Sequence, residues 1–515
     1  MKKVTLIFIF LFVGPLWSQI ELVGPSITKQ KLKKHIQILA SDSMGGREVG
    51  EVGETMAANY MSNHFRNIGA KPYKENTYIQ KIPLEKIKIN DASLIIGKES
   101  FVFGKDFYTY PNFKHCKINK SELVFLGYGI HTDTYSDYTQ DVSGKVIVIS
   151  VGEPKKEDGS YIISNSEKKS PHTSWRHKLN IAKKRGVKAV VFVSNDYESE
   201  YIKSTHKIEE PGVNLISKNE LIPFIFVSKN VIKKVLGKNK FKKYLTQMQN
   251  NEDSKSKILK TNFLFQLNTE TNNFYGKNIL AYIEGSDSIL KNEIVVITAH
   301  YDHLGIVDGV IYNGADDNAT GTAALLEIAS AFQKAKKEGV TFKRSILFFP
   351  NSAEEKGLLG SYYYVENPAY PIENTVACLN IDMIGRTDRF HPKDSNYIYL
   401  IGSDKLSTDL HKVSEQSNNK YVKMNIDYTF NNPNDPNRFY YRSDHYNFAK
   451  KNIPSIFYFS GVHEDYHKES DTVEKIIYEK VEKTARLVFY TAWEIANMKT
   501  KPKVDKLNEF QLNRY

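Results

Sequence analysis

The sequence predicts an α/β protein built around a mostly parallel sheet that is sandwiched by helices. From Asn278 onward, short strands rich in β-branched residues alternate with longer segments of helical periodicity. One strand, residues 294–298, is a continuous run of β-branched residues, which is typical of a parallel strand buried on both faces. A β-rich stretch that starts near residue 121 predicts a small separate domain inserted before this alternation.

Length and composition indicate a globular protein of two or three domains. A chain of 515 residues is too long for one hydrophobic core. The apolar fraction of 41% and the charged fraction of 25% are ordinary for folded proteins, so wholesale disorder is excluded. The net charge of +12 comes with no stripe of basic and aromatic residues, so we interpret it as a solvated lysine-rich face and expect no nucleic-acid partner.

The first 19 residues have the pattern of a secretory signal peptide rather than of a buried N-terminal helix. Two lysines precede an apolar run at residues 4–13, and Gly14, Pro15 and the small residue Ser18 follow it. This run is too short to span a bilayer, no Cys follows it, and no later segment approaches ~20 apolar residues. We therefore expect an exported protein, periplasmic or extracellular, with no stable membrane anchor.

The two cysteines, Cys116 and Cys378, are too few to form a disulfide framework. Cys378 lies in an apolar strand and is predicted to be a buried thiol. A bridge between the two is an alternative in an oxidising compartment, and it requires two distant segments to meet.

The first half of the chain contains helices, a turn-rich loop and short strands. Helical periodicity covers residues 28–40 and 54–68, with a turn-rich loop at 41–47 between them. Short alternating runs between residues 78 and 110 predict strands. The inserted domain is predicted to contain strands at 122–128, 145–151, 189–193 and 222–227 and a helix at 174–184. A Lys- and Asn-rich stretch, residues 238–260, reads as a helix followed by a solvated connection.

The second half carries the regular alternation. The predicted strands are residues 279–283, 294–298, 345–349, 376–381, 397–401 and 455–459. The predicted helices are residues 321–336, 405–416, 445–450 and 474–498.

Five places in this predicted sheet end in residue types that bind metals or transfer protons. They are His300 with Asp302, Asp316, Glu354-Glu355, Asp382, and Tyr466-His467. Each alone has a structural explanation, such as a solvated carboxylate or an acidic first turn of a helix. Together they indicate one site, because ligand sites in open α/β sheets lie beyond the carboxyl ends of the strands. Asp302, two positions after His300, is expected to fix the tautomer of that ring.

Two imidazoles and three carboxylates form a mixed nitrogen and oxygen ligand set. This set suits Zn²⁺, with Co²⁺ or Mn²⁺ as alternatives. Five ligands exceed the three protein ligands typical of one catalytic zinc, whereas two metals that share one carboxylate would use them all. Asp316, flanked by Gly314 and Ala315, is the predicted bridging residue.

The motifs GADDNATG, AEEKGLLGS, NIDM and YHKESDT, in this order after a strand ending HYDH, closely resemble the co-catalytic di-zinc exopeptidases. That family includes secreted bacterial leucine aminopeptidases, aminopeptidase Y and glutamate carboxypeptidase II. The resemblance covers residues 278–498. More weakly, residues 41–69 resemble the family's N-terminal segment, and residues 122–227 resemble its protease-associated (PA) domain.

The resemblance implies a phosphorylase/hydrolase-like zinc peptidase fold and assigns the metal ligands. His300 and Asp382 would hold one zinc, Glu355 and His467 the other, and Asp316 would bridge them. Glu354 matches the general base. Tyr466 matches a hydroxyl that stabilises the oxyanion in some members of the family, while other members supply this hydroxyl from elsewhere. The family also has a cis peptide bond after the bridging aspartate, here expected at Asp316-Asp317.

The implied function is hydrolysis of a peptide bond by a metal-activated water, with peptides or small proteins as substrates. Two metals ~3.5–4 Å apart would activate the water and polarise the peptide carbonyl. Glu354 would take the proton from the water and pass it to the leaving amine. Aminopeptidase activity is the first expectation.

Three alternatives stay open from the sequence. A carboxypeptidase or dipeptidase is one alternative, and the choice depends on whether the carboxylate of Asp444 faces the free amine of the substrate or the guanidinium of Arg442 faces its free carboxylate. Ser443 or Asp444 would equally serve as the cap of a helix at His445. A glutaminyl cyclase would bind one zinc, and a non-catalytic relative such as the transferrin receptor would have lost ligands.

The resemblance also divides the chain. The expected parts are a signal peptide at 1–19, an N-terminal part of the peptidase domain at 20–120, a PA-like insert at 121–262, the main peptidase domain at 263–500 and a tail at 501–515. The insert is expected to restrict access to the active site.

Overall fold

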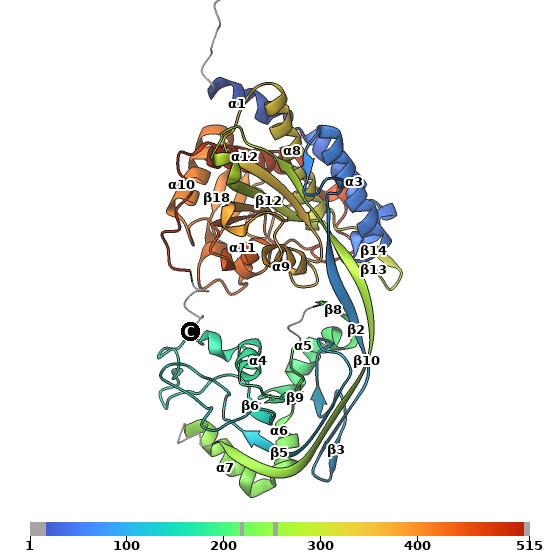
Figure 1. The fold of residues 1–515 in the computed structure, drawn as a ribbon, viewed down its shortest axis with the longest axis vertical. Helices are drawn as coiled ribbons and strands as arrows, with labels where there is room; N and C mark the ends of the chain where they lie inside the picture. Colours follow the sequence, from blue (N-terminus) through green and yellow to red (C-terminus); the bar gives the residue numbers. More distant parts are fainter. Residues whose placement is uncertain (1–16, 217–220, 251–255, 509–515) are drawn as a thin grey trace, which may run out of the picture. The chain divides into compact units, whose positions relative to one another are not determined.

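The computed structural model describes residues 17–216, 221–250 and 256–508. Most of the expected signal peptide, and residues 509–515 of the expected tail, lie outside the described residues. The described chain forms two compact units, which we call unit 1 (residues 17–82 and 275–508) and unit 2 (residues 83–274). Two long strands, β2 (Ile79–Ile96) and β10 (Lys257–Ile279), run from one unit into the other (Figure 1).

Unit 1 is built on an eight-stranded sheet with the order β1-β11-β15-β12-β16-β19-β17-β18. Its strands are β1 (Lys71–Pro72), β11 (Ala281–Ile283), β12 (Ile294–His300), β15 (Ser345–Asn351), β16 (Thr375–Ile381), β17 (Tyr397–Ile401), β18 (Asn425–Asp427) and β19 (Ser455–Phe459). The four central strands, β15, β12, β16 and β19, are parallel to one another, while the pairs next to them are antiparallel. The predicted mostly parallel α/β sheet is confirmed.

Helices cover both faces of this sheet, and successive apolar side chains of β12 point alternately to the two faces. Val295 and Ile297 belong to one buried cluster, which includes residues of the helices on the first face. Ile294 and Val296 belong to a second cluster with the helices on the other face. The first face is covered by α2 (Lys29–Leu39), α3 (Val52–Ile68), α8 (Gly321–Lys337), α10 (Thr408–Ser417) and α12 (Tyr478–Asn497), and the second by α9 (Leu359–Glu366) and α11 (His445–Lys450).

The parallel register places the ends of the central strands at one edge of the sheet. β12 ends at His300, paired with Asn351 at the end of β15, and β16 ends one residue before Asp382. Because parallel strands share a direction, the loops that follow them start at the same edge. A short hairpin, β13 (Gly305–Val307) and β14 (Val310–Tyr312), and the turn η5 (Ala315–Thr320) follow β12 there.

Unit 2 contains a nine-stranded sheet whose main path is β3-β2-β10-β5-β6-β7-β9-β4, with β8 paired to β2. Its remaining strands are β3 (Glu99–Phe101), β4 (Phe107–Tyr108), β5 (Cys116–Phe125), β6 (Val146–Ser150), β7 (Ala189–Val193), β8 (Gly212–Leu215) and β9 (Phe224–Val227). The compact unit begins at Pro83, earlier than the boundary expected at residue 121. The physical reason is that β2 pairs with β3 and β8, and sequence patterns do not encode such partners.

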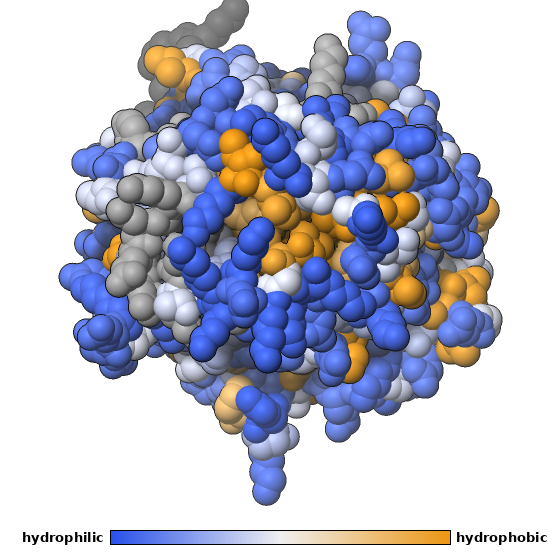
Figure 2. Space-filling view, turned by 90° about the horizontal axis from the view of Figure 1, so that it is seen from below, coloured by the Kyte–Doolittle hydropathy of each residue, from blue (hydrophilic) through white to orange (hydrophobic). Residues whose placement is uncertain are grey.

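The helices of unit 2 are α4 (Trp175–Lys184), α5 (Tyr197–Glu209), α6 (Lys229–Leu236) and α7 (Lys238–Asn250). Lysines of α6 and α7 contribute to the net positive charge. Figure 2 shows one face of the molecule, on which hydrophilic side chains surround a smaller apolar area. Over the described ranges, no helix is long and apolar enough to cross a bilayer. Cys116 and Cys378 are free thiols, and Cys378 is buried.

Lys178 on α4 is a fully buried lysine in unit 2. Its ammonium group donates to the carbonyl oxygens of Ser150 at 3.0 Å and Gly152 at 2.5 Å, which fixes α4 to the end of β6. Burial lowers the pKa of Lys178 to about 7, because the charged form loses its hydration.

We predict that this lysine makes stability rise with pH. Between about pH 7 and pH 10.5 the unfolded chain holds a proton on Lys178 that the folded chain has released, so the free energy of unfolding increases across this window. Lys178→Met should remove that rise in denaturant titrations of the full chain. Lys184→Met, at an exposed position of the same helix, is the control and should leave the rise unchanged.

Candidate metal centre

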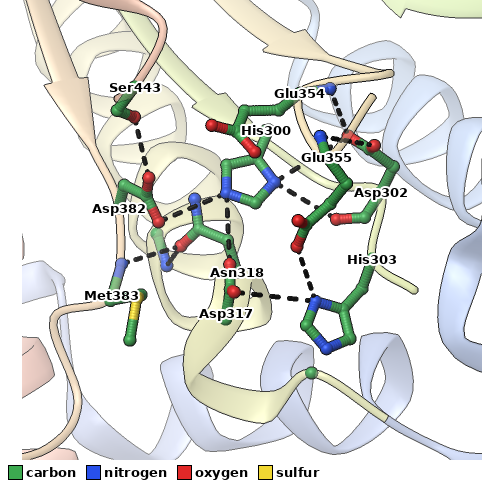
Figure 3. A network of polar contacts seen from close by, with 12 residues as sticks. His300, Asp302, His303, Asp317, Asn318, Glu354, Glu355, Asp382, Met383 and Ser443 are labelled. Carbon is green, nitrogen blue, oxygen red and sulfur yellow. Dashed lines mark hydrogen bonds and ion pairs between the residues drawn. The ribbon is translucent and has the colours of Figure 1, made fainter. Parts of the chain in front are cut away.

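Imidazole and carboxylate groups converge at the carboxyl edge of the unit 1 sheet (Figure 3). Three overlapping groups have ligand atoms within 4.8 Å of one another: His300, Asp317 and Asp382; His300, Glu354 and Glu355; and His303, Asp317 and Glu355. His467 joins them, with its Nε2 3.1 Å from Asp317 Oδ2 and 3.2 Å from Glu355 Oε2. These groups come from five separate segments of the chain.

Asp317 stands at the centre of this arrangement. One of its oxygens, Oδ1, is 3.3 Å from His300 Nε2, and the other, Oδ2, is 3.1 Å from His467 Nε2. Burial alone would raise the pKa of this carboxyl, but its contacts with the two imidazoles hold the pKa well below the usual range. The carboxylate that faces both halves of the site is therefore Asp317.

The expectation that Asp316 bridges two metals does not fit this geometry. Asp316 Oδ1 accepts hydrogen bonds from the backbone N–H of Gly385 at 2.6 Å and from the Thr320 hydroxyl at 3.1 Å. Its Oδ2 lies 3.3 Å from His463 Nε2. The sequence offers two adjacent aspartates, and small flanking residues do not determine which of them points into the site.

The cis peptide bond lies one residue later in the sequence than expected, as the central aspartate does. It joins Asp317 and Asn318, not Asp316 and Asp317 as expected. Its relation to the central carboxylate is unchanged, since it still follows the aspartate that faces both halves.

His300 and Asp382 form the first half of the site. His300 Nε2 is 3.2 Å from Asp382 Oδ1, and the Ser443 hydroxyl donates to Asp382 Oδ2 at 2.7 Å. Asn380 in turn donates to Ser443 at 2.7 Å. Burial would lower the pKa of His300, but Asp382 and Glu354 outweigh it and raise the pKa well above the usual value. Ser443 thus orients the carboxylate of Asp382, a role that sequence reasoning missed.

Asp302 has a different contact from the one expected. His300 Nδ1 is 3.1 Å from the backbone carbonyl oxygen of Asp302, whereas the nearer carboxylate oxygen is 3.8 Å away. The carboxylate instead accepts the backbone N–H groups of Glu354 at 3.2 Å and Glu355 at 3.3 Å. The carbonyl fixes the tautomer of His300, and the side chain holds the Glu354-Glu355 turn.

Glu355, His467 and His303 form the second half. Besides its contact with His467, Glu355 lies with Oε1 2.9 Å from His303 Nδ1. Although burial opposes it, contact with His303 and His467 lowers the pKa of Glu355 to about 2. His303 was not predicted, although the second histidine of the HYDH motif was a signal that could have found it.

Glu354 lies beside both halves and makes none of the close imidazole contacts of Glu355. Burial, and then the negative charges of Glu355, Asp382 and Asp444, raise its pKa well above the usual value. A carboxylate of high proton affinity next to a candidate metal site is suited to accept a proton.

Three strained backbone positions direct these side chains. Ala353, Met383 and His467 have φ values of 60°, 52° and 55°, in the left-handed region that non-glycine residues seldom occupy. Ala353 precedes Glu354, and Met383 follows Asp382. Such strain is concentrated at functional sites, where the surrounding structure holds it in place.

Tyr466 packs directly on His467, with ring centroids 3.9 Å apart. Its hydroxyl is 3.4 Å from a guanidinium nitrogen of Arg442, which is exposed. Burial, with Asp317 and Glu355 nearby, raises the pKa of Tyr466, so its hydroxyl is a proton donor at neutral pH. The tyrosine therefore lies at the rim of the site.

Asp444 lies beneath the site rather than at its surface. It is fully buried, and its carboxylate accepts the side-chain amide of Asn351 at 2.9 Å. Burial raises its pKa to about 6. No side-chain hydrogen bond caps α11. Asp444 is therefore enclosed, and Arg442 is exposed.

The residues present fit a pair of divalent metal ions. Among the described residues, the buried His303 Nε2 has no hydrogen-bond partner, and His467 Nε2 lies beside the carboxylates of Asp317 and Glu355. Two imidazoles and three carboxylates, His300, Asp382, Asp317, Glu355 and His467, form two sets of three that share Asp317. Nitrogen and oxygen ligands of this kind suit zinc.

Comparisons with known proteins agree with this chemistry. Residues 278–492 match peptidase family M28. Aminopeptidase YwaD of Bacillus subtilis is 24% identical over 467 residues, covering 90% of this chain and 85% of that protein. Leupeptin-inactivating enzyme 1 of Streptomyces exfoliatus is 37% identical over 111 residues, 21% of this chain and 23% of that one. The solved aminopeptidase from Aneurinibacillus sp. strain AM-1 shares the fold, with a TM-score of 0.53, 19% identity and coverage of 95% of this chain and 98% of that one.

Asp471 holds the turn that carries Asp317. Its carboxylate accepts the backbone N–H of Asp316 at 3.0 Å and that of Asp317 at 3.1 Å. We predict that Asp471→Asn lowers the free energy of unfolding by about 1–3 kcal/mol, because the amide that replaces one oxygen faces these N–H donors. We expect zinc affinity to fall ~10–100-fold, measured by competition with a chromophoric chelator.

A nearby aspartate is the control for this prediction. Asp465 lies in the same segment and pairs with Lys475 at 2.6 Å and Arg386 at 2.9 Å, whereas the backbone N–H groups of Asp316 and Asp317 donate to Asp471. Asp465→Asn should leave zinc affinity unchanged. Equal zinc affinities for Asp471→Asn and the unmodified chain would show that this hydrogen bonding does not position Asp317.

Proposed function

From the membership of residues 278–492 in peptidase family M28, we propose that the protein is an exported zinc aminopeptidase with a two-metal site. The observation that carries the proposal is the carboxylate of Asp317, which faces His300 on one side and His467 on the other. The names of two relatives, an aminopeptidase and a leupeptin-inactivating enzyme, support peptides as the substrate class.

We assign His300, Asp382 and Asp317 to one zinc ion and Glu355, His467 and Asp317 to the other. Zinc bound there would supply an activated water molecule and polarise the scissile carbonyl. Ser443 orients Asp382, and His303 orients Glu355, so each half of the site has one fixed carboxylate. Such supporting contacts set how tightly metal ligands are held.

Glu354 is the proposed general base. It is adjacent in sequence to Glu355, and Asp302 fixes the turn that carries both residues by accepting their backbone N–H groups. Its raised pKa favours accepting a proton from the attacking water at Oε and returning it to the leaving amine nitrogen. The reaction begins from the free carboxylate, because a general base must start without the proton.

Tyr466 is the proposed donor to the oxygen that gains negative charge during the reaction. Its stacking on His467 fixes the ring, and its hydroxyl is protonated at neutral pH because the pKa is raised. A fixed donor at this place would stabilise the developing charge without reorganising.

The proposal extends to the remaining parts of the chain. We propose that residues 1–19 are a signal peptide and that unit 2 is a PA-like insert that adjusts substrate preference. Cobalt or manganese would be accepted by the same ligands in place of zinc.

The proposed function predicts a separation between catalysis and metal binding. Glu354→Gln should lower turnover of amino-acid anilides by about 10²–10⁴-fold, since it removes the proton acceptor while leaving the ligands in place. Zinc content, measured by atomic emission, should stay at two ions per chain. Glu338→Gln, at an exposed position on the surface, serves as the control and should be fully active.

Substrate panels test the choice of aminopeptidase. Peptides with a free N-terminus should be cleaved, acetylated ones should not, and a chelator should abolish the activity. Full activity of zinc-loaded Glu354→Gln would contradict the role of the base. Equal cleavage of blocked and unblocked peptides would contradict an aminopeptidase.

A further inference from the structure

Arg47 is a fully buried arginine at the end of the turn η2 (Asp42–Arg47), which joins α2 to α3. Its guanidinium group makes hydrogen bonds to backbone carbonyl oxygens in three separate segments. Nε donates to Tyr301 at 2.7 Å, and Nη2 donates to Gly314 at 2.9 Å. Nη1 donates to Asn313 at 2.7 Å and also to Leu39.

These acceptors lie where the candidate metal ligands enter and leave the site. Tyr301 directly follows His300, whereas Asn313 and Gly314 lead into the turn that carries Asp317. The chain between them leaves the sheet as the hairpin β13–β14 and then returns. Arg47 therefore joins both ends of this excursion and anchors them to the end of α2.

The backbone around Arg47 is shaped for this contact. Gly45, Gly46 and Arg47 have φ values of 52°, 68° and 56°. A Cβ atom at Gly46 would lie 2.5 Å from the carbonyl oxygens of both Gly305 and Tyr312, so only glycine allows the turn to approach the base of the hairpin. A strained arginine after a glycine pair indicates that the position of its side chain matters.

The charge of Arg47 complements the site. No carboxylate pairs directly with its guanidinium in the described contacts. The carboxylates with the largest electrostatic effect on its pKa are Asp302, Asp317, Asp471 and Glu355. Burial lowers the pKa of Arg47 to about 10, and it stays charged at neutral pH. A fixed positive charge behind a dense set of carboxylates reduces their mutual repulsion.

We propose that Arg47 is a positioning residue that holds the segments of His300 and Asp317 at the spacing required to bind two metal ions. This inference rests on the proposed two-metal site. It assigns a function to the N-terminal segment, which contributes no ligand of its own. Arginine suits the position because a planar group with five donors reaches three segments at once, whereas lysine has three donors at one point.

A second buried arginine provides a matched control. Arg344 is also fully buried in unit 1 and donates to the carbonyl oxygens of Ile495 and Met498 and to the carboxylate of Glu293. These acceptors lie at the end of α12 and just before β12, at the opposite end of that strand from His300. Its replacement therefore removes similar buried hydrogen bonds without loosening the His300–Asp317 excursion.

The test compares R47K and R47M with R344K and R344M in the full chain. Zinc dissociation is measured by competition with a chromophoric chelator, and folding by circular dichroism and thermal unfolding of the metal-free protein. R47K should weaken binding of at least one zinc ion by ~10-fold or more, with a larger effect in R47M. R344K should bind both ions within about twofold of the unmodified chain, although both lysine variants unfold at lower temperature.

The outcomes separate this inference from the proposed function. If R47K binds zinc as the unmodified chain does while unfolding at the temperature of R344K, Arg47 is only structural and the inference is overturned. If R47M does not fold, R47K decides the question. An unmodified chain that binds no zinc would overturn the proposed function, and with it this inference. A chain that binds two ions while R47K binds them equally tightly would overturn the inference alone.

Discussion

The structure of unit 1 depends on bringing four carboxylates, Asp317, Glu354, Glu355 and Asp382, into one small volume beside three imidazoles, those of His300, His303 and His467. Like charges at this spacing repel strongly in a partly buried environment, so opposite charge must be close by. The shifted pKa values of His300, Asp317 and Glu354 reflect this balance. Two divalent cations would neutralise these carboxylates more completely than protons can.

The sheet explains how such a cluster forms from distant parts of the chain. Parallel pairing of β12, β15 and β16 brings three strand ends to one edge. Their buried apolar residues fix the register, since a slip by one residue would turn every side chain to the opposite face. The loops beyond the strands carry the reactive groups, and contacts from Asp302, Ser443, Asp471 and Arg47 hold those loops.

Sequence patterns predict the sheet well because burial on both faces leaves an apolar signal. The strands predicted at 397–401 and 455–459 have these bounds in the structure, and the helix predicted from residue 445 begins there. The helix predicted from residue 405 begins at Thr408, because the side chain of Ser407 accepts the N–H of Leu410 and caps it. Hydrophobic periodicity predicts the presence of a helix more accurately than the residue at which the helix begins.

The parts that were missed depend on geometry that no local pattern records. Asp316 and Asp317 have the same chemistry, and only the path of the turn decides which of them faces His300 and His467. Arg47 lies more than 250 residues before the loop that it holds, at sequence separations of 254 and 267. The start of unit 2 at Pro83 depends on the strands that pair with β2. Residue types identified the chemistry, and tertiary structure assigned the individual positions.

We propose that two metal ions share one carboxylate, that of Asp317. Zinc-edge anomalous diffraction from crystals of the full chain grown with zinc tests it directly. We expect two peaks ~3.5–4 Å apart, each ~2.0–2.2 Å from a different oxygen of Asp317. A single peak, or a pair of peaks bound to Asp316 and not to Asp317, would contradict it.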